Sequence, residues 1–407
     1  MPHRPLIACS FCGTVHGRVD PEPGGRALCH CCHCELYRRG RLSAEQWVAL
    51  AWAGLIVFAW AQAFPIAHLS ILGLDVNVTF WQALRLSWDR GYYGVSVMAG
   101  LVGFWFPLMR IALTLWALQS IVSHRPLPDL SRPLRWLGWL TPWAMASVLV
   151  LAMLVAFVKL AGLAQVQIGP GLPGFFALIF LIAGLSRWDA HALWRLAEDR
   201  GRVSASGVLG QGVDCAECGY VQPSSVSGRC RRCHGRLRGA GPGYRAEVWA
   251  LVLAAALFYI PANLLPVMRV QTLLGGSNHT ILGGVLELWR VGSWDLALIV
   301  FVASVMVPVT KLFALAFLLL HPDPASVEQG RRQTRLYEIV ERIGQWSMLD
   351  VFVVVWLAAM ANFPGLSQIQ IGPAALNFGM VVVLTMAATL RYDPRRDWKS
   401  LRERVHD

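Results

Sequence analysis

Ten cysteines gather in two short segments of this 407-residue chain, at spacings that suit a metal ion. The later segment begins with Cys215-x2-Cys218 and, after eleven further residues, ends with Cys230-x2-Cys233. Each Cys-x2-Cys turn can present two thiolates to one tetrahedral ion, and Gly219 supplies the permissive backbone that such a turn needs. We therefore predict a zinc ribbon with these four cysteines as ligands.

The earlier segment is crowded and holds six cysteines: Cys9, Cys12, Cys29, Cys31, Cys32 and Cys34. Two pairs compete to complete its metal site, Cys29 with Cys32 and Cys31 with Cys34. In the later segment a histidine follows the last cysteine directly and a leucine follows it by four residues, and the same spacing recurs after Cys32. We therefore favour Cys9, Cys12, Cys29 and Cys32 as ligands, with Cys31 and Cys34 spare.

Disulfides and redox chemistry are the competing interpretations of these cysteines. A thioredoxin-like site needs one Cys-x2-Cys in a βαβ unit, whereas two such pairs stand in each short segment. Four thiolates leave no open position for a substrate, so we expect two structural Zn²⁺ ions and no metal catalysis. Nothing positive in the sequence supports binding of nucleic acid by these ribbons.

The rest of the chain has the composition of a multi-pass membrane protein. Of its residues 56% are hydrophobic and only 15% are charged, and the mean hydropathy is +0.49. A bilayer span needs about 20 apolar residues in a helix. Eight stretches meet that need: 47–69, 93–121, 137–161, 172–190, 246–268, 294–320, 345–363 and 372–391.

The positive charges indicate how these spans are oriented. Of the 36 lysines and arginines, 29 lie in the segments 1–46, 123–135, 187–247, 321–345 and 391–407, and only three lie in the opposite loops. Because positive charge stays on the cytoplasmic side, we predict that both termini and both cysteine segments are cytoplasmic. Disulfides rarely persist there. The net charge of +12 then needs no nucleic acid, since anionic lipid headgroups can balance it.

The chain is an internal duplication. At an offset of 201, Pro107 matches Pro308 and Arg110 matches Lys311, and at 203 the segment Gln165–Pro170 matches Gln368–Pro373. Each half has a cysteine segment followed by four spans. Because four is even, the halves share one orientation. We predict an all-α membrane fold of two parallel repeats with five parts: zinc ribbon 1 (1–46), repeat 1 (47–190), linker and zinc ribbon 2 (191–245), repeat 2 (246–391) and a basic tail (392–407).

Ionisable side chains inside spans are costly and are candidates for function. Lys311, beside Thr310, and Asp350 should lie at similar depth near the cytoplasmic ends of adjacent spans, so an ion pair or a proton-sharing pair is plausible. Arg110, the repeat partner of Lys311, could merely extend toward the headgroups, and Lys311 has the same alternative. Three further polar positions complete the candidates: Ser147, the partner of Asp350, and Lys159 with its partner Asn362.

Two prolines stand three residues before the paired cations. Pro107 and Pro308 should each free a carbonyl and kink the helix, and a free carbonyl beside a cation can form a polar pocket. The Gln-x-Gln-Ile-Gly-Pro segments alternate polar and apolar residues, and we expect them to be either short strands or a surface for a partner. No phosphate-binding loop and no Ser-x-x-Lys or Gly-x-Ser-x-Gly nucleophile motif is present, so we expect no catalytic residue and no enzyme.

The whole pattern resembles the paraquat-inducible protein A (PqiA) family, and within it the LetA-like members. The likeness rests on the two ribbons and on Pro107–Arg110, Pro308–Lys311, Phe157–Lys159, Ile369–Pro373 and Asp393–Arg395. It covers essentially the entire chain, and the crowded Cys29–Cys34 cluster departs from the pattern.

The resemblance implies a multi-pass subunit of the bacterial inner membrane. It implies a periplasmic MCE-domain partner, a homo-oligomeric tunnel, and movement of phospholipid or other lipophilic molecules between the bilayer and that tunnel. An ion gradient would then supply any energy, with Lys311 and Asp350 as the pair that responds to it. A small-molecule efflux permease and a scaffold or sensor that transports nothing are the alternatives. The short outward loops cannot cross a periplasm by themselves, which favours a partnered transporter.

Overall fold

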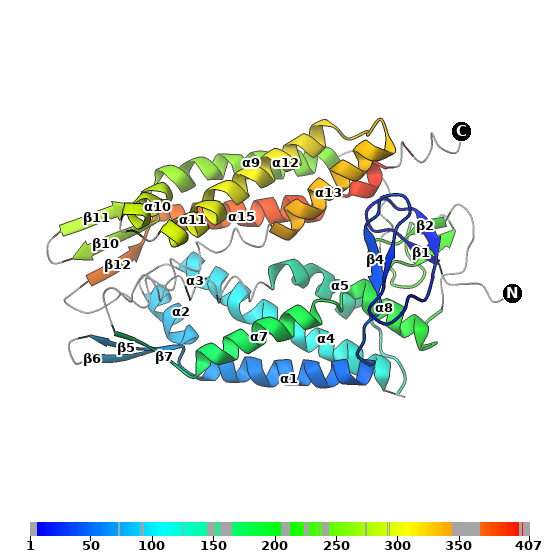
Figure 1. The fold of residues 1–407 in the computed structure, drawn as a ribbon, viewed down its shortest axis with the longest axis horizontal. Helices are drawn as coiled ribbons and strands as arrows, with labels where there is room; N and C mark the ends of the chain where they lie inside the picture. The colour runs from blue at the N-terminus through cyan, green and yellow to red at the C-terminus, as the bar shows by residue number, and fades with distance from the viewer. Residues whose placement is uncertain are drawn as a thin grey trace.

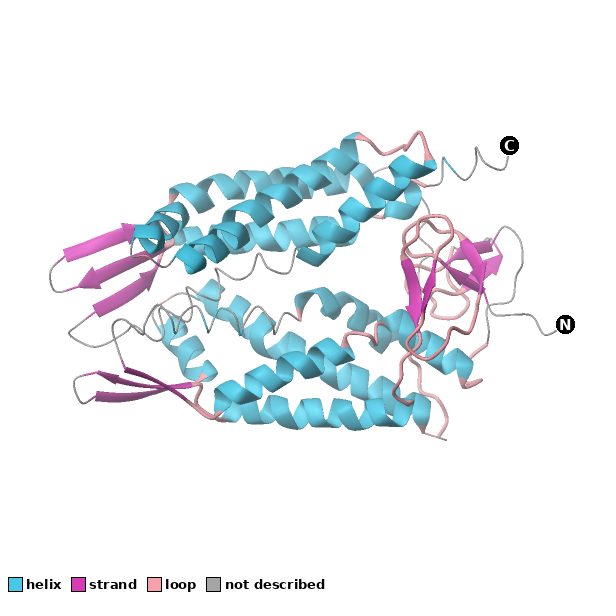
Figure 2. Cartoon of the chain, viewed as in Figure 1, coloured by secondary structure: helices cyan, strands magenta, loops and turns pink. Residues whose placement is uncertain are grey.

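The chain folds as two similar halves that lie side by side. The computed structural model describes residues 6–398 and 401, apart from gaps at 72–73, 90, 92, 124, 145–149, 151, 153, 155–164, 205–211, 224–227, 236, 238–243, 273–274, 291, 293 and 344–366. Figure 1 shows the long helices of both halves running in roughly the same direction, with the cysteine segments at one end. Short strands that belong to the two halves, and not to the cysteine segments, stand at the other end (Figure 2).

The first half begins with helix α1 (Ala44–Ala63) and alternates helices with short strands. Ser43 and Gln46 form a capping box at the start of α1, in which each side chain bonds the backbone N–H of the other residue. The remaining elements are β5 (Ala67–Ile71), β6 (Leu74–Val78), α2 (Phe80–Asp89), α3 (Tyr93–Gly100), the π-helical turn η1 (Leu101–Trp105), α4 (Phe106–Val122), α5 (Ser131–Leu140), the 3₁₀ turn η2 (Thr141–Trp143), β7 (Gln165–Ile168), α7 (Gly171–Leu185) and α8 (Ala190–Asp199).

The second half repeats this order of elements. It consists of α9 (Tyr244–Leu264), β10 (Met268–Thr272), β11 (Gly275–His279), α10 (Ile281–Arg290), α11 (Trp294–Phe301), the π-helical turn η3 (Val302–Met306), α12 (Val307–Leu320), α13 (Val327–Ile343), β12 (Ser367–Ile371), α15 (Pro373–Arg391) and the 3₁₀ turn η5 (Pro394–Arg396). The π-helical turns η1 and η3 stand 201 residues apart, at the offset found in the sequence. The predicted duplication is therefore confirmed.

Within the described residues, five helical segments are long and apolar enough to cross a membrane. They are Ala44–Ala63, Ser96–Val122, Tyr244–Leu264, Ala297–Leu320 and Pro373–Arg396, and the pair α7 and α8, bent by 56°, would add a sixth. These segments match five of the eight predicted spans. The predicted span 345–363 lies outside the described residues, as does most of 137–161. The start of the latter differs from the prediction, because residues 137–143 belong to the amphipathic α5 and to a 3₁₀ turn that contains Pro142.

Two antiparallel sheets of three strands stand at the end opposite the cysteine segments. Their strand orders are β6-β5-β7 and β11-β10-β12. The third strand of each sheet comes from a Gln-x-Gln-Ile segment, with Leu69 opposite Val166 in one sheet and Val270 opposite Ile369 in the other. The strand alternative for these segments is thus correct, and the fold is mainly helical rather than all-α.

Packing requires the glycine that stands before the proline in each Gln-x-Gln-Ile-Gly-Pro segment. A Cβ at Gly169 would lie 2.3 Å from the carbonyl oxygen of Pro65, and one at Gly372 would lie 2.0 Å from that of Pro266. Only glycine permits so close an approach of two backbones. The motif therefore fixes the return of the chain beside the end of the first helix of each half.

Candidate metal centres and buried cations

The later cysteine segment folds around a four-thiol cluster. It contains the hairpin of β8 (Gly212–Asp214) and β9 (Val221–Pro223). The Sγ atoms of Cys215, Cys218, Cys230 and Cys233 all lie within 4.8 Å of one another, and all four side chains are buried. Opposed sulfur atoms stand 3.6 Å apart in two pairs, Cys215 with Cys233 and Cys218 with Cys230.

The earlier segment forms an equivalent cluster from two hairpins, β1 (Leu6–Ala8) with β2 (Val15–Gly17) and β3 (Arg26–Leu28) with β4 (Glu35–Arg38). Its four gathered thiols are those of Cys9, Cys12, Cys29 and Cys32. Opposed sulfur atoms stand 3.5 Å apart, Cys9 with Cys32 and Cys12 with Cys29. Cys31 and Cys34 lie outside this cluster, and the Cys34 thiol faces the Cys32 carbonyl oxygen at 3.9 Å.

These distances fit a bound metal better than a disulfide. A disulfide joins sulfur atoms at about 2 Å, whereas a tetrahedral ion with bonds of about 2.3 Å holds its sulfur ligands nearly 4 Å apart. All ten cysteines are free thiols. Hydrogen bonds from neighbouring thiols, first that of Cys215, hold the pKa of Cys230 far below its ordinary value. Those of Cys12, Cys32 and Cys9 do the same for the pKa of Cys29. The four gathered sulfur atoms of each cluster are placed to bind one cation as thiolates.

One turn geometry builds all four Cys-x2-Cys knuckles. The residue that follows the second cysteine has a positive φ in each knuckle: 70° at Gly13, 62° at His33, 70° at Gly219 and 55° at His234. Its N–H donates to the carbonyl of the first cysteine at 2.8–3.0 Å. The histidines that align the two segments in the sequence thus stand at turn positions rather than in a ligand shell.

A polar shell adjoins the first cluster. The Nε2 atom of His16 lies 3.2 Å from the Cys29 sulfur, and its Nδ1 atom lies 3.1 Å from Nδ1 of His30. The hydroxyl of Thr14 lies 3.2 Å from the Cys12 sulfur. Partners of this kind orient metal ligands, and spacing in the sequence alone does not single them out.

Each ribbon is held by an arginine of the half that it does not precede. Arg331 of α13, in the second half, donates from Nε to the Cys31 carbonyl of ribbon 1 at 2.7 Å. Arg135 of α5, in the first half, donates from Nη2 to the Cys233 carbonyl of ribbon 2 at 3.2 Å and pairs with Glu217 at 2.8 Å. Since α5 and α13 hold matching places in the two halves, the two contacts form a reciprocal pair.

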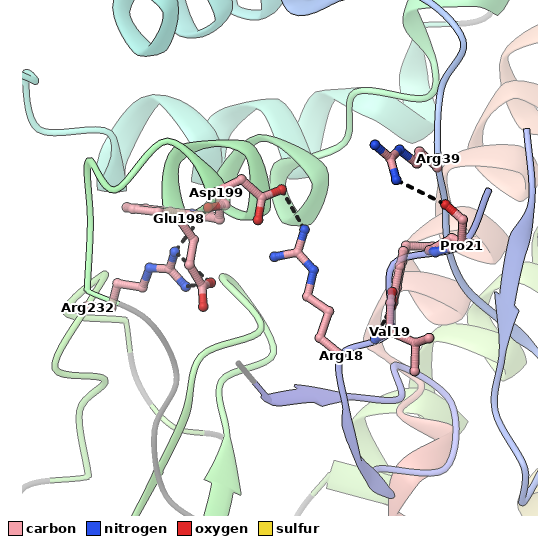
Figure 3. A network of polar contacts seen from close by, with 9 residues as sticks. Arg18, Val19, Pro21, Arg39, Glu198, Asp199 and Arg232 are labelled. Carbon is pink, nitrogen blue, oxygen red and sulfur yellow. Dashed lines mark hydrogen bonds and ion pairs between the residues drawn. The ribbon is translucent and has the colours of Figure 1, made fainter. Parts of the chain in front are cut away.

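Helix α8 joins the two ribbons through its last turn, as Figure 3 shows. Asp199 accepts from Arg18 of ribbon 1 at 2.5 Å, and Glu198 pairs with Arg232 of ribbon 2 at 3.4 Å. The latter pair is buried, and the Arg232 guanidinium also lies over the Trp194 ring at 4.9 Å. Arg395, beyond α15, pairs with Asp214 of ribbon 2. The ribbons therefore bridge both halves at this end of the molecule.

Lys311 lies inside the second half and is only 1% exposed. Its Nζ atom lies 3.4 Å from the Thr385 hydroxyl of α15, and that hydroxyl in turn donates to the Val382 carbonyl at 3.0 Å. In the part of the chain that the structure describes, no carboxylate oxygen lies within 4.0 Å of Nζ. A buried ammonium with so few partners is costly, which is typical of a functional group.

Arg110 occupies the matching place in the first half and is 8% exposed. Pro107 and Pro308 are buried and stand in the first turns of α4 and α12. The expected disturbance of each helix takes the form of a π-helical turn just before the proline. In the first half it is closed by the Phe106 N–H, which donates to the Leu101 carbonyl.

Of the other polar positions predicted to accompany Lys311, the structure describes Thr310. Asp350, Lys159, Ser147 and Asn362 lie outside the described residues. Thr310 is exposed, because consecutive residues of a helix point in directions about 100° apart and Lys311 points inward. Sequence reasoning missed Thr385. Its only signal is the spacing of two buried threonines, Thr385 and Thr389, one turn apart in an apolar helix.

Comparison with known proteins matches both halves of the chain to one family. The family model for paraquat-inducible protein A matches residues 44–198 and again 246–402. The chain is 30% identical to the intermembrane transport protein PqiA of Escherichia coli over 413 residues, covering 98% of this chain and 97% of the relative. It is 30% identical to the lipophilic envelope-spanning tunnel protein A of the same organism over 403 residues, covering 98% and 92%.

A third relative is a probable intermembrane transport protein of Haemophilus influenzae, 27% identical over 406 residues, covering 97% of this chain and 96% of the relative. No solved structure matches the chain significantly. The two family matches coincide with the two halves seen in the structure, and the full-length relatives cover both ribbons. The chain belongs to the paraquat-inducible protein A family.

Proposed function

We propose that this protein is an inner-membrane subunit of an envelope lipid-transport system. It moves phospholipid or other lipophilic molecules between the inner membrane and a periplasmic MCE-domain tunnel, and it is not an enzyme. The observation that carries the proposal is the full-length similarity to relatives named for intermembrane transport and for a lipophilic envelope-spanning tunnel. Helices long enough to span a membrane in both halves support it.

In this proposal the ribbons, both termini and the basic tail lie in the cytoplasm, and the two sheets face the periplasm. The concentration of arginine in the segments at the ribbon end supports this orientation. The proposed domains are ribbon 1 (1–46), repeat 1 (47–190), the linker with ribbon 2 (191–245), repeat 2 (246–391) and the tail (392–407). The sheets extend beyond the helices, and they offer an end on which a tunnel could seat (Figure 2).

The two cysteine clusters hold one structural Zn²⁺ each in this proposal. The ligands are Cys9, Cys12, Cys29 and Cys32 in ribbon 1, and Cys215, Cys218, Cys230 and Cys233 in ribbon 2. Four thiolate ligands favour zinc and leave no position for a substrate. Because each ribbon bonds to both halves, the metals brace the halves against each other.

Lys311 is the group that we assign to coupling with an ion gradient. It is buried against Thr385 in the described part of the protein, and Asp350 is its proposed carboxylate partner. A lysine that exchanges a proton with a buried carboxylate can change the packing of the helices around it. Charge reversal at Lys311 or Asp350 should abolish transport without loss of expression. Full activity of both single alanine variants would remove this assignment.

Gentle purification of the full chain from native membranes tests the main proposal. We expect mass spectrometry to recover an MCE-domain protein and enriched phospholipid with the chain. The matched control is the same purification from cells that lack the MCE-domain proteins, in which the enrichment of lipid should fall. Recovery of the chain alone, with neither protein nor lipid, would contradict the proposal and favour a permease or a scaffold.

A further inference from the structure

A groove of about 600 Å³ opens on the first half between α2 and α3 and continues along η1. Its lining combines three tryptophans, one cation and one carboxylate with a small apolar floor: Trp81, Arg85, Trp88, Asp89, Val97, Gly100 and Trp105. The three tryptophan side chains are 45–49% exposed, so they stand on the outer surface of the half. This size is within the range of small-molecule sites in proteins.

The spacing of residues along the two helices creates this groove. Trp81, Arg85 and Trp88 follow one another at intervals of four and three residues, so they share one face of α2. The floor is tied together by Ser96, whose hydroxyl donates to the Leu84 carbonyl at 2.9 Å. Gly100 lies in this floor, where a Cβ would make only an ordinary van der Waals contact with Leu84, at 3.5 Å, but a larger side chain would occupy the groove.

The second half lacks several of the features that make this groove, although Trp289 keeps the place of Trp88 and Arg290 stands at that of Asp89. At the matching positions, 201 residues later, it carries Phe301 for Gly100, Leu286 for Arg85 and Met306 for Trp105. The large Phe301 side chain thus stands where Gly100 leaves a gap. The apolar Leu286 replaces the guanidinium, and the flexible Met306 replaces an indole ring. The groove is therefore a property of the first half rather than of the repeat.

We propose that this groove binds one phospholipid molecule, with its phosphate against Arg85 and an acyl chain over Gly100. Asp89 lines the same groove one turn along α2, but no carboxylate oxygen lies within 4.0 Å of the Arg85 guanidinium in the described parts of the chain, so this group can still bind an anion. A guanidinium matches a phosphate with two parallel hydrogen bonds. Exposed tryptophans beside it suit the boundary between headgroups and acyl chains. The inference rests on the proposed function and names the lipid class that this subunit takes up.

Photo-crosslinking in native membranes tests the groove against ordinary surrounding lipid. A benzophenone side chain is introduced at Val97 in the groove or at Leu298, its repeat partner, in the full chain, and cellular phospholipids are labelled with radioactive phosphate. The two positions are 47% and 53% exposed, and the parallel repeat places them at the same depth. We expect labelling at Val97 to exceed that at Leu298 by about tenfold, the value of one charge-assisted hydrogen bond.

Two substitutions that copy the second half should remove this excess. Gly100→Phe fills the floor, and Arg85→Leu removes the phosphate contact, so each should lower labelling at Val97 to the level of Leu298. The other half already carries both residues, so the fold accommodates them, and the φ of −65° at Gly100 suits any residue. Gly100→Ala is the control that should keep the label.

Equal labelling at the two positions, or an excess that survives Gly100→Phe, would overturn the groove as a phospholipid site. A fatty acid would carry no radioactive phosphate and would also leave the two positions equal. The co-purification described above reports separately on the proposed function. Equal labelling with an MCE-domain partner recovered would overturn only the groove, whereas selective labelling without a partner would support the groove and contradict the transport assembly.

Discussion

The two halves share one architecture but keep different polar groups inside it. The second half buries Lys311 completely and places the Thr385 hydroxyl beside it. The first half has Arg110 at the matching position, and its residue corresponding to Thr385, at the later offset of 203, is the apolar Ile182. The backbone was thus retained while the hydroxyl at this position stands in the second half only, and the first half instead buries Thr114 one turn after Arg110.

On the outer surface it is the first half that carries the distinctive polar group. The first half carries a cation and a glycine gap between α2 and α3, where the second half has Leu286 and Phe301. A duplicated fold can assign separate tasks to its copies, because each copy tolerates substitutions at positions that the backbone does not need. We infer a division in which the first half receives lipid and the second half responds to an ion. The ribbons, bonded to both halves, are the structures that can link the two tasks.

Loss of the metal from ribbon 2 should have the largest effect. Cys218→Ser removes one of four ligands, and structural zinc contributes on the order of 10 kcal/mol to the folding of such modules. We expect the metal content to fall from about two ions per chain to about one. Hydrogen exchange should rise in α5 and α8 of the first half, because Arg135 and Glu198 then lose their ribbon partners.

Cys34→Ser is the matched control for this variant, because Cys34 is buried beside a cluster without belonging to it. It should keep both ions and the exchange pattern of the native chain. Faster exchange confined to the start of α9, the helix that ribbon 2 precedes, would show that the ribbon braces only its own half. That result would break the reciprocal arrangement on which the link between the halves depends.

Replacement of the buried lysine should separate stability from transport. Lys311→Met combined with Asp350→Leu removes the proposed pair of buried charges without leaving either one unpaired, so we expect stability to rise by about 1–4 kcal/mol. Transport of lipid should be lost in the same variant. Thermal unfolding of the purified chain measures the first effect, and transfer of labelled lipid from membranes that contain the chain and its partner measures the second.

Arg110→Met tests whether the buried cation of the first half, unlike Lys311, is dispensable for transport. Arg110 is more exposed than Lys311, and the position that corresponds to Thr385 holds Ile182 rather than a threonine. We expect a smaller gain in stability and transport that is largely preserved. Equal loss of transport in the two variants would mean that both halves respond to the ion, and the proposed division of tasks would fail.

Sequence patterns were sufficient for features that depend on spacing. The offset of 201 predicts the matching order of elements in the halves, and two Cys-x2-Cys pairs predict each four-thiol cluster. The same alignment favours the second pair, Cys29 with Cys32, that the structure gathers with Cys9 and Cys12. These features follow from local turns and from repetition, which a single sequence displays directly.

Features that depend on distant contacts could not be predicted in this way. Strand β7 pairs with β5 about a hundred residues earlier, and its alternating pattern alone suits either a strand or a docking surface. The contact between Arg331 and ribbon 1 spans 300 residues of sequence. Thr385 becomes notable only once α15 packs against α12. In each case the informative partner lies far along the chain, and no local pattern names it.

Removal of the arginine that holds ribbon 1 should have the smallest effect of these substitutions. Arg331→Ala breaks the bond to the Cys31 carbonyl and the weaker one to the His30 carbonyl. A hydrogen bond from a charged donor to a partly buried carbonyl contributes about 1.5 kcal/mol. We expect hydrogen exchange in the second knuckle of ribbon 1 to increase by about tenfold, while both metal ions remain bound.

The neighbouring Arg332 gives the control, because it lies on the same helix, its side chain is 80% exposed and, among the described residues, its ion-pair partner is Glu328 one turn away. Such surface pairs contribute about 0.5 kcal/mol or less, so Arg332→Ala should leave the knuckle unchanged. The matching substitution in the first half, Arg135→Ala, should loosen ribbon 2 to a greater extent, since it also breaks the pair with Glu217. A larger effect at ribbon 1 than at ribbon 2 would reverse the order of the two contacts, and it would make the second half, rather than the first, the firmer support of the ribbon end.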